Sequence, residues 1–310
     1  MSRRVDIIAP KAGMPAWGGP DNLREGRMIM RVGLAGDLPV GLCDREDDID
    51  EPPYLWSDLV ARRNALSLRV EDLVPVLRVD LRKYRSRETG ALEVGPDLVE
   101  ELIAMEEFVA GEAANLLAAS PAGGTVVLHA VVDQGEFEKA YPDARTLRDL
   151  VPYPMSLQHV AVGRAAAELS RRGRDNEVHR GDRRADLMAR RLAAGLLKAE
   201  TAWLLGIDEK RYAKFERSTA APPAGLVTEL QAIDNFITTS AEQLEVTESG
   251  GVSVVMMIDE QAEFERAYPQ ARTQRDAVVY PRRVHRVAAA RRAHVLEAGG
   301  GSARIAVAER

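Results

Sequence analysis

Two short basic segments carry the side chains best suited to bind another molecule. One is DLRKYRSRE at residues 80–88 and the other is DEKRYAKFE at residues 208–216. Arginine and lysine donate hydrogen bonds to guanine edges and phosphate oxygens, and serine also bonds to base edges. The candidate contact residues for double-stranded DNA are Arg82, Lys83, Arg85, Ser86, Lys210, Arg211 and Lys214.

The second basic segment lies within Leu196–Arg217, which has the spacing of two helices joined by a short turn. Ala202 is small enough to let the two helices approach, and Gly206 is placed to end the first of them in a left-handed conformation. Asp208 is placed to cap the next helix. Tyr212 and Phe215 are spaced to face the core, which leaves the basic side chains on the outer face.

This segment and its flanks resemble the five-helix DNA-binding domain of the Cro and phage-repressor (XRE) family. The resemblance covers a helix at 183–194, the turn motif, the aromatic-plus-Glu pair Phe215-Glu216, and a helix at 226–238. It implies that the outer face of the helix at 208–216 enters the major groove. The sequence departs from the family at Ser218, where a turn glycine is common.

The chain repeats itself at a spacing of 128 residues. Residues 58–63 (DLVARR) align with 186–191 (DLMARR), and the two basic segments align with each other. After a one-residue gap, FEKAYPDARTLRDLVPYP at 137–154 aligns with FERAYPQARTQRDAVVYP at 264–281, with 13 of 18 positions identical. The sequence therefore predicts one two-part unit present twice.

The first copy of the helix pair is less regular than the second. Helices are expected at 55–66, 70–77, 80–88 and 98–116, but Val74 and Arg78 replace the small residues, and Pro75 falls inside a helix. Residues 78–87 contain five basic residues and one acidic, a balance of +4, whereas 208–217 contain four and three, a balance of +1. The first copy is either the more strongly charged DNA reader or a degenerate copy kept for packing.

A small strand and helix module is expected after each helical domain. In the first copy we expect a strand at 125–132, a helix at 136–141, a strand at 150–153 and a helix at 156–171. In the second copy the corresponding elements are expected at 252–259, 263–268, 277–280 and 284–297. The complete unit is similar to the anti-CRISPR-associated repressors, which implies that the module pairs two heads over an inverted repeat.

The predicted fold is mainly α with small α+β modules, in two tandem copies of a five-helix domain and a β-α-β-α module. The expected boundaries are an N-terminal arm at 1–54, helical domains at 55–119 and 181–247, and modules at 120–180 and 248–310. In the arm, residues 26–43 are consistent with two short strands, and disorder is the alternative.

Composition narrows the class of protein. Of 310 residues, 45% are hydrophobic, and no apolar run is long enough to cross a membrane. Without a signal-peptide core the protein is expected in the cytoplasm. The single cysteine, Cys43, excludes an internal disulfide and a cysteine-rich zinc site. The net charge of −6 argues against nonspecific coating of DNA, so any DNA contact depends on local positive charge.

No set of residues indicates catalysis, a metal or a cofactor. The five histidines lack metal-ligand spacing, and no phosphate-binding or dinucleotide motif is present. Thr, Arg and Asp recur together in both modules, and we interpret them as residues that hold a turn. The recurring residues are Arg145, Thr146, Arg148, Asp149, Arg272, Thr273, Arg275 and Asp276.

These observations favour a DNA-binding transcriptional regulator, most simply a phage or bacterial repressor. Fusion of two copies would make the usual dimer intramolecular, so the expected operator is an imperfect inverted repeat with unlike halves. The alternative is a protein-interaction adaptor or antitoxin-like protein with degenerate helix pairs. Self-association of the chain and binding to RNA remain open at this point.

Overall fold

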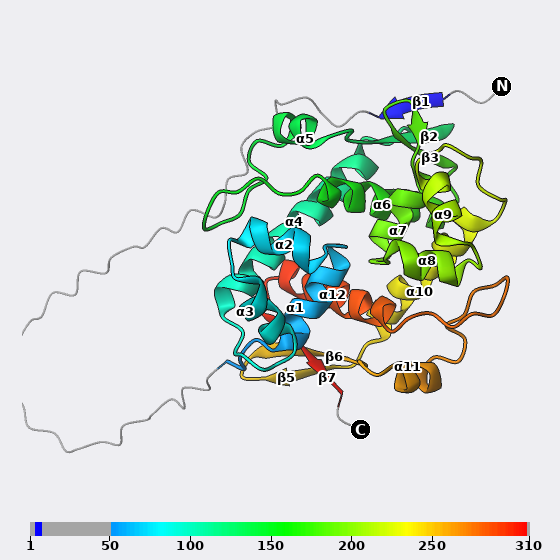
Figure 1. The fold of residues 1–310 in the computed structure, drawn as a ribbon. Coiled ribbons are helices and arrows are strands. Elements are labelled where there is room, and N and C mark those ends of the chain that lie inside the picture. The colour runs from blue at the N-terminus through cyan, green and yellow to red at the C-terminus, as the bar shows by residue number, and fades with distance from the viewer. Residues whose placement is uncertain (1–3, 8–50, 309–310) are drawn as a thin grey trace, which may run out of the picture.

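The computed structural model describes residues 4–7 and 51–308. This part of the chain is mainly helical, with small α+β portions and two sheets. The sheets lie at opposite ends of the body, with helices between them (Figure 1). The strands considered for residues 26–43, and Cys43 itself, lie outside the described residues. The one described element of the N-terminal arm is strand β1 (Arg4–Ile7).

The first half of the described chain closely follows the expected order of helices. The helices at 70–77 and 156–171 have the predicted bounds, and the remainder differ by a few residues at their ends. The elements are α1 (Trp56–Ala65), α2 (Val70–Leu77), α3 (Leu81–Glu88), α4 (Pro96–Ala118), β2 (Thr125–Ala130), α5 (Gln134–Ala140), α6 (Ser156–Arg171), β3 (Asn176–Arg180) and β4 (Arg183–Arg184).

The second half repeats the order of the helices. Its first helix is shorter than the expected 183–194, because Arg183 and Arg184 form β4 instead. The elements are α7 (Asp186–Ala193), α8 (Lys198–Leu204), α9 (Glu209–Glu216), α10 (Leu226–Gln243), β5 (Val246–Ser249), β6 (Val252–Met257), α11 (Gln261–Ala267), α12 (Arg283–Ala298) and β7 (Ala303–Val307).

Each sheet is built around a buried, β-branched strand. In the four-stranded sheet, order β1-β2-β3-β4, strand β2 runs parallel to both neighbours, and Leu128 lies opposite Ile7 and Val178. In the three-stranded sheet, order β5-β6-β7, strand β6 pairs antiparallel with β5 and parallel with β7. The long crossover that parallel pairing requires is made by α5 and α6 in one sheet and by α11 and α12 in the other.

The β-α-β-α order expected for the modules is wrong at its second strand. Residues 150–153 and 277–280 each contribute only to an isolated bridge, Arg145 with Pro152 and Arg272 with Val279. Leu150 and Ala277 both have φ of +52°, which breaks the extended backbone that a strand needs. The observed order is strand, helix, helix, strand, and the parallel partner strands β3 and β7 follow the last helix.

The two halves interlock. Helix α1 packs on α12 and β7 of the second half, while α7 packs on α6 and β3 of the first (Figure 1). Both crossings are closed by the same backbone contacts: Ile305 N–H donates to Asp58 Oδ1 at 2.9 Å, and Val178 N–H donates to Asp186 Oδ1 at 3.0 Å. Each half therefore completes the packing of the other.

A second pair of contacts recurs at corresponding positions, one within each half. Arg164 of α6 donates to the carbonyl of Ala65 at 3.1 Å, and Arg291 of α12 donates to the carbonyl of Ala193 at 2.9 Å. In each case an arginine from a long helix donates a hydrogen bond to a carbonyl group in the last turn of α1 or α7, where carbonyl groups have no partner within the helix. These arginines fix both helix ends against the centre of the body.

Unusual backbone conformations recur at the same spacing as the sequence repeat. Each described residue other than glycine that has positive φ has a positive-φ counterpart 128 or 127 positions away, which is either glycine or another such residue. The pairs are Ser67 and Gly195, Arg78 and Gly206, Gly90 and Ser218, and Leu150 and Ala277. Because a left-handed conformation is costly for residues with a side chain, its recurrence at four corresponding places reflects a common chain path.

Candidate nucleic-acid interface

The second helix pair, α8 and α9, has the local geometry that its sequence predicts. Gly206 lies in the left-handed region with φ of +62°, and Ala202 is buried between the helices. Asp208 caps α9 by accepting a hydrogen bond from the N–H of Arg211 at 3.1 Å. Tyr212 and Phe215 are buried, which turns the opposite face of α9 outward.

The first helix pair, α2 and α3, reaches a similar geometry from a less regular sequence. Arg78 takes the place of the turn glycine and adopts the left-handed conformation itself, with φ of +50°. Pro75 lies inside α2 without ending it, and Val74 is buried where the second pair has alanine. Asp80 accepts from the N–H of Lys83 at 2.9 Å, and Tyr84 is buried. The departures in sequence therefore do not abolish the turn.

The candidate contact residues lie on two outward faces, which we call the α3 face and the α9 face. On the α3 face, Arg82, Lys83 and Arg85 are exposed, whereas Ser86 is half-buried and offers less of its side chain. The α9 face is formed by Lys210, Arg211 and Lys214, all of which are exposed. Helices α3 and α9 lie at the left and the upper right of the body in Figure 1, so the fold brings together the members of each face but keeps the two helices apart.

Two of these side chains have partners within the protein. Arg85 pairs with Glu71 of α2 at 2.7 Å, and both side chains are 58% exposed. The guanidinium of Arg211 lies over the ring of Phe215, 5.6 Å from its centroid. Among the described residues, no acidic side chain forms an ion pair with Arg82, Lys83, Lys210 or Lys214. These four cations are available to an external anion.

An inward ion pair holds each of the two helices to its neighbours. Arg191 of α7 contacts Glu216 at 2.5 Å and also donates to the carbonyl of Leu196 at 2.8 Å. Arg63 of α1 makes the equivalent contacts to Glu88 and to the carbonyl of Leu68. Sequence reasoning identified the aromatic-plus-Glu pair but missed its arginine partners, although an arginine precedes each glutamate by the same interval in both repeats.

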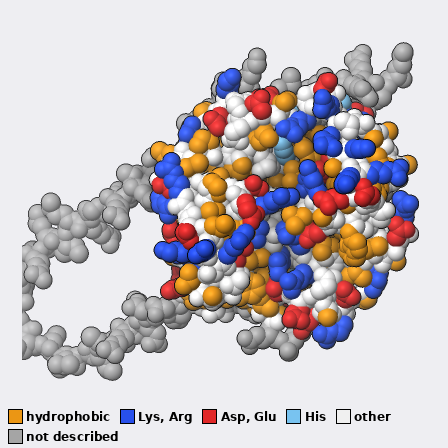
Figure 2. Space-filling model, viewed as in Figure 1, with side chains coloured by type: hydrophobic (Ala, Val, Ile, Leu, Met, Phe, Trp, Pro, Cys, Tyr) orange, Lys and Arg blue, Asp and Glu red, His pale blue; other side chains and the backbone are white. Residues whose placement is uncertain are grey.

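This inward pairing changes the charge that each face presents. Glu216 counts as one of three acidic residues in the segment 208–217, yet its side chain is 3% exposed and neutralised by Arg191. The α9 face is consequently more basic than the count of residues indicates. On the side of the molecule shown in Figure 2, Lys and Arg side chains are interspersed with Asp and Glu.

Comparisons of the chain with protein-family models, curated proteins and solved structures found no match. No helix in the described ranges is both long enough and apolar enough to span a membrane.

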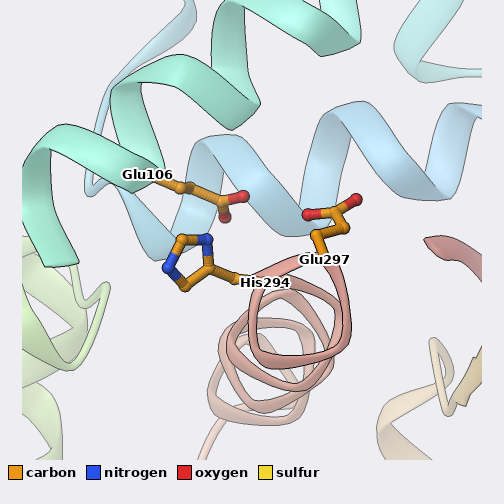
Figure 3. Close-up of side chains that lie close together, drawn as sticks. All are labelled: Glu106, His294 and Glu297. Carbon is orange, nitrogen blue, oxygen red and sulfur yellow. The ribbon is translucent and has the colours of Figure 1, made fainter. Parts of the chain in front are cut away.

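A second cluster of chemically active side chains lies at the centre of the body. Glu106 of α4 and His294 and Glu297 of α12 point toward one another, with potential ligand atoms within 4.8 Å (Figure 3). The buried guanidinium of Arg62 contacts both carboxylates, with distances of 2.6 Å to Glu106 and 2.6 Å to Glu297. Arg62 already supplies the positive charge that a metal ion would bring, so we assign this cluster to the joining of α1, α4 and α12.

Burial shifts the pKa values of this central cluster in opposite directions. Removal from water raises the pKa of Glu106 to about 7, although the charge of Arg62 opposes the shift. Burial lowers the pKa of His294 to about 4, and the nearby arginines lower it further. A neutral histidine thus adds no positive charge beside Arg62 near neutral pH.

Recurring Thr and Arg residues hold the turn after α5 and after α11. Thr146 accepts from the N–H of Val151 at 2.9 Å, and Arg145 donates to the carbonyl groups of Pro142 and Leu150. Thr273 and Arg272 make the corresponding bonds in the second half. Glu101 of α4 adds bonds from the N–H groups of residues 147 and 148. These contacts give the four Thr and Arg residues a structural role, whereas Asp149 and Asp276 each pair with the arginine that precedes them.

Proposed function

We propose that the chain is a sequence-specific DNA-binding regulator of transcription, most simply a repressor, related to the XRE and Cro-type regulators. The observation that carries the proposal is the pair of basic outward faces on α3 and α9. Each face lies on the second helix of a helix pair, after a left-handed turn and an aspartate cap. A buried ion pair between an arginine and a glutamate holds the inner side of that helix to the rest of the protein. A helix presented in this way is suited to the major groove.

We further propose that the two halves are tandem copies, so that the chain acts as an intramolecular pseudo-dimer. The recurring left-handed positions support this, and so do two pairs of corresponding bonds: Ile305 to Asp58 and Val178 to Asp186 between the halves, and Arg164 to Ala65 and Arg291 to Ala193 within each half. Because α1 and α7 each pack on the other half, the separation of the α3 and α9 faces is set by the interior of the protein. The preferred operator is then an imperfect inverted repeat, since the two faces carry different side chains.

The experiment starts with selection of bound fragments from a random pool of duplex DNA by the full chain. The affinity for the selected operator is then measured at several salt concentrations for the Lys210→Ala/Lys214→Ala and Arg82→Ala/Lys83→Ala variants. Each lost base contact is expected to cost about 1–3 kcal/mol, and each lost phosphate contact is expected to make the salt dependence less steep.

Arg266→Ala is the control, because Arg266 is 76% exposed and lies on neither face. It should leave operator binding unchanged. If a double variant binds the operator as tightly as the parent chain, that face does not read DNA. If no duplex is enriched from the pool, the proposal fails as a whole.

A protein-interaction adaptor is the second candidate, and one observation favours it. Trp203 on α8, the helix that packs on α9, is 61% exposed, and tryptophan is enriched at protein interfaces. Salt separates the two functions. Binding to DNA weakens steeply as salt rises, because phosphate contacts release counterions, whereas an adaptor would show no retention on operator DNA or heparin at low salt.

A further inference from the structure

A hollow of about 530 Å³ lies beside the α3 face, at the junction of the two halves. Its walls come from α1, from α2 and α3, and from Asp259 and Arg286 of the second half. Pockets for small molecules typically have volumes of roughly 300–1,000 Å³. The hollow is therefore large enough for a small organic ligand and lies where a ligand would touch both halves.

The charged residues of the hollow are not equally committed to one another. Arg63 is held by Glu88 at 2.5 Å and Arg286 by Asp259 at 2.6 Å, and all four side chains are less than one-fifth exposed. Arg85 differs, because its partner Glu71 is as exposed as Arg85 itself. An exposed ion pair contributes little stability, so Arg85 can exchange Glu71 for another anion at small cost. Arg85 is the cation that an incoming carboxylate would find.

The apolar part of the hollow is formed by Trp56, Val60 and Val70. Trp56 is held at close range to Gly90, where a Cβ atom would lie 3.1 Å from the indole Cδ1. A side chain at position 90 would therefore press against the ring, and glycine leaves that part of the indole uncovered. An indole wall favours a planar aromatic partner, and a guanidinium favours a carboxylate that it can bind through two hydrogen bonds.

The second half lacks the residues that make this hollow. At the positions 128 residues on, Arg184 replaces Trp56, Ala213 replaces Arg85, and Ser218 replaces Gly90. The second half therefore has no aromatic residue at the position of Trp56 and no arginine at the position of Arg85. The hollow is a property of the first half and not a by-product of the repeated fold.

We propose that this hollow binds a small planar aromatic carboxylate, stacked on Trp56 and paired with Arg85. One consequence rests on the proposed function: a bound carboxylate withdraws Arg85 from the α3 face, so the ligand lowers the affinity of the first half for DNA. The ligand would then act as an inducer that weakens DNA binding at the α3 face and leaves the α9 face unchanged.

The test uses the full chain and three probes in ligand-observed NMR titrations: benzoate, neutral benzamide and non-aromatic cyclohexanecarboxylate. We expect benzoate to bind, and benzamide and cyclohexanecarboxylate each to bind about tenfold more weakly or worse, because each lacks one of the two contacts. Equal binding of benzoate and benzamide would overturn the role of Arg85, and absence of benzoate binding would overturn the site.

Variants separate this site from nonspecific binding. Arg85→Gln and Trp56→Leu should each weaken benzoate about tenfold, with folding checked by circular dichroism. The control is Arg266→Gln, since Arg266 is 76% exposed and ion-paired with Glu263 but is not among the residues that line the hollow. If Arg266→Gln weakens benzoate as much as Arg85→Gln does, the binding is nonspecific and the proposal fails.

The DNA consequence is measured separately, by adding benzoate to the complex of the chain with its selected operator. Release of DNA from the parent chain but not from Arg85→Gln supports the inducer role. If benzoate binds to the parent chain and the operator complex is unaffected, the inducer role is wrong while the ligand site stands. If no operator is found, the DNA function fails independently of the benzoate titration.

Discussion

The left-handed turn at Arg78 offers a sharp test of how the two helix pairs are built. Arg78 and Gly206 occupy corresponding positions with φ of +50° and +62°. In this conformation a residue with a Cβ atom costs about 1–2 kcal/mol of stability, which glycine would avoid. Glycine also gives the unfolded chain more conformational freedom, and this offsets about 0.4–1 kcal/mol of the benefit. Arg78→Gly is therefore expected to stabilise the protein by roughly 1 kcal/mol relative to Arg78→Ala.

The alanine variant is the necessary reference because it removes the guanidinium but keeps the backbone cost. The opposite change, Gly206→Ala, should destabilise the protein by about 1 kcal/mol. There the nearest atom to a new Cβ is Asp276 Oδ2 at 3.4 Å, an ordinary contact, so conformation and not crowding sets the cost. Urea unfolding monitored by circular dichroism measures all three variants. If Arg78→Gly is no more stable than Arg78→Ala, the left-handed strain assigned to this turn is absent.

Three further changes test the interior. Glu216→Gln leaves the buried guanidinium of Arg191 without its counter-charge, so a loss of roughly 3 kcal/mol is expected in urea unfolding; a loss below 1 kcal/mol would contradict the clamp. Gly163→Ala places a Cβ 2.1 Å from a backbone oxygen of α7, and a loss of about 1–3 kcal/mol in the same assay is expected from the overpacked crossing; unchanged stability would show that α6 and α7 can separate freely. Burial lowers the pKa of His285 to about 4 from 6.5, so the unfolded chain binds the proton first and stability is lost as pH falls through this window, by up to about 3 kcal/mol. In the first half, Gln158 accepts from the N–H of Val131 in the way that His285 accepts from the N–H of Ile258, so glutamine can replace His285 and keep this bond. The variant His285→Gln should therefore lose that part of the pH dependence, and an unchanged pH profile of unfolding would refute the assignment.

The helix pairs could be predicted from sequence because their signals are local. Gly206, Asp208 and the spacing of Tyr212 and Phe215 act over one or two turns of chain, and each has the expected conformation, cap or burial. Local signals were misleading at Ser218, where the family commonly has a turn glycine. Ser218 nevertheless adopts the left-handed conformation, with φ of +53°, as Gly90 does at the corresponding position. A neighbouring tertiary contact, from Ser218 Oγ to the carbonyl of Arg184, accompanies that conformation.

The central strands β2 and β6 were predicted, but the strands that pair with them and the interlock escaped prediction because their signals are not local. Strand β3 reads NEVHR and has only Val178 fully buried, so it lacks the run of apolar residues that marks β2. Its identity as a strand depends on pairing with β2, some fifty residues earlier. Likewise, the partners of Arg62 are Glu106 and Glu297, and the second lies 235 residues away. No periodicity in the sequence reports a contact across that distance.

The interlock explains why the two basic faces cannot be treated as independent heads on a linker. Helix α3 is tied to α1 through Arg63 and Glu88, and α1 is tied to the second half through Arg62 and Glu297 and through the bond from Ile305 to Asp58. Reorienting the α3 face by more than a side-chain movement would therefore break buried ion pairs, each of which is costly to leave half-paired. A flexible tether would let two heads search for half-sites at many spacings. With this chain path, the spacing of any sites that the two faces contact is fixed when the protein folds.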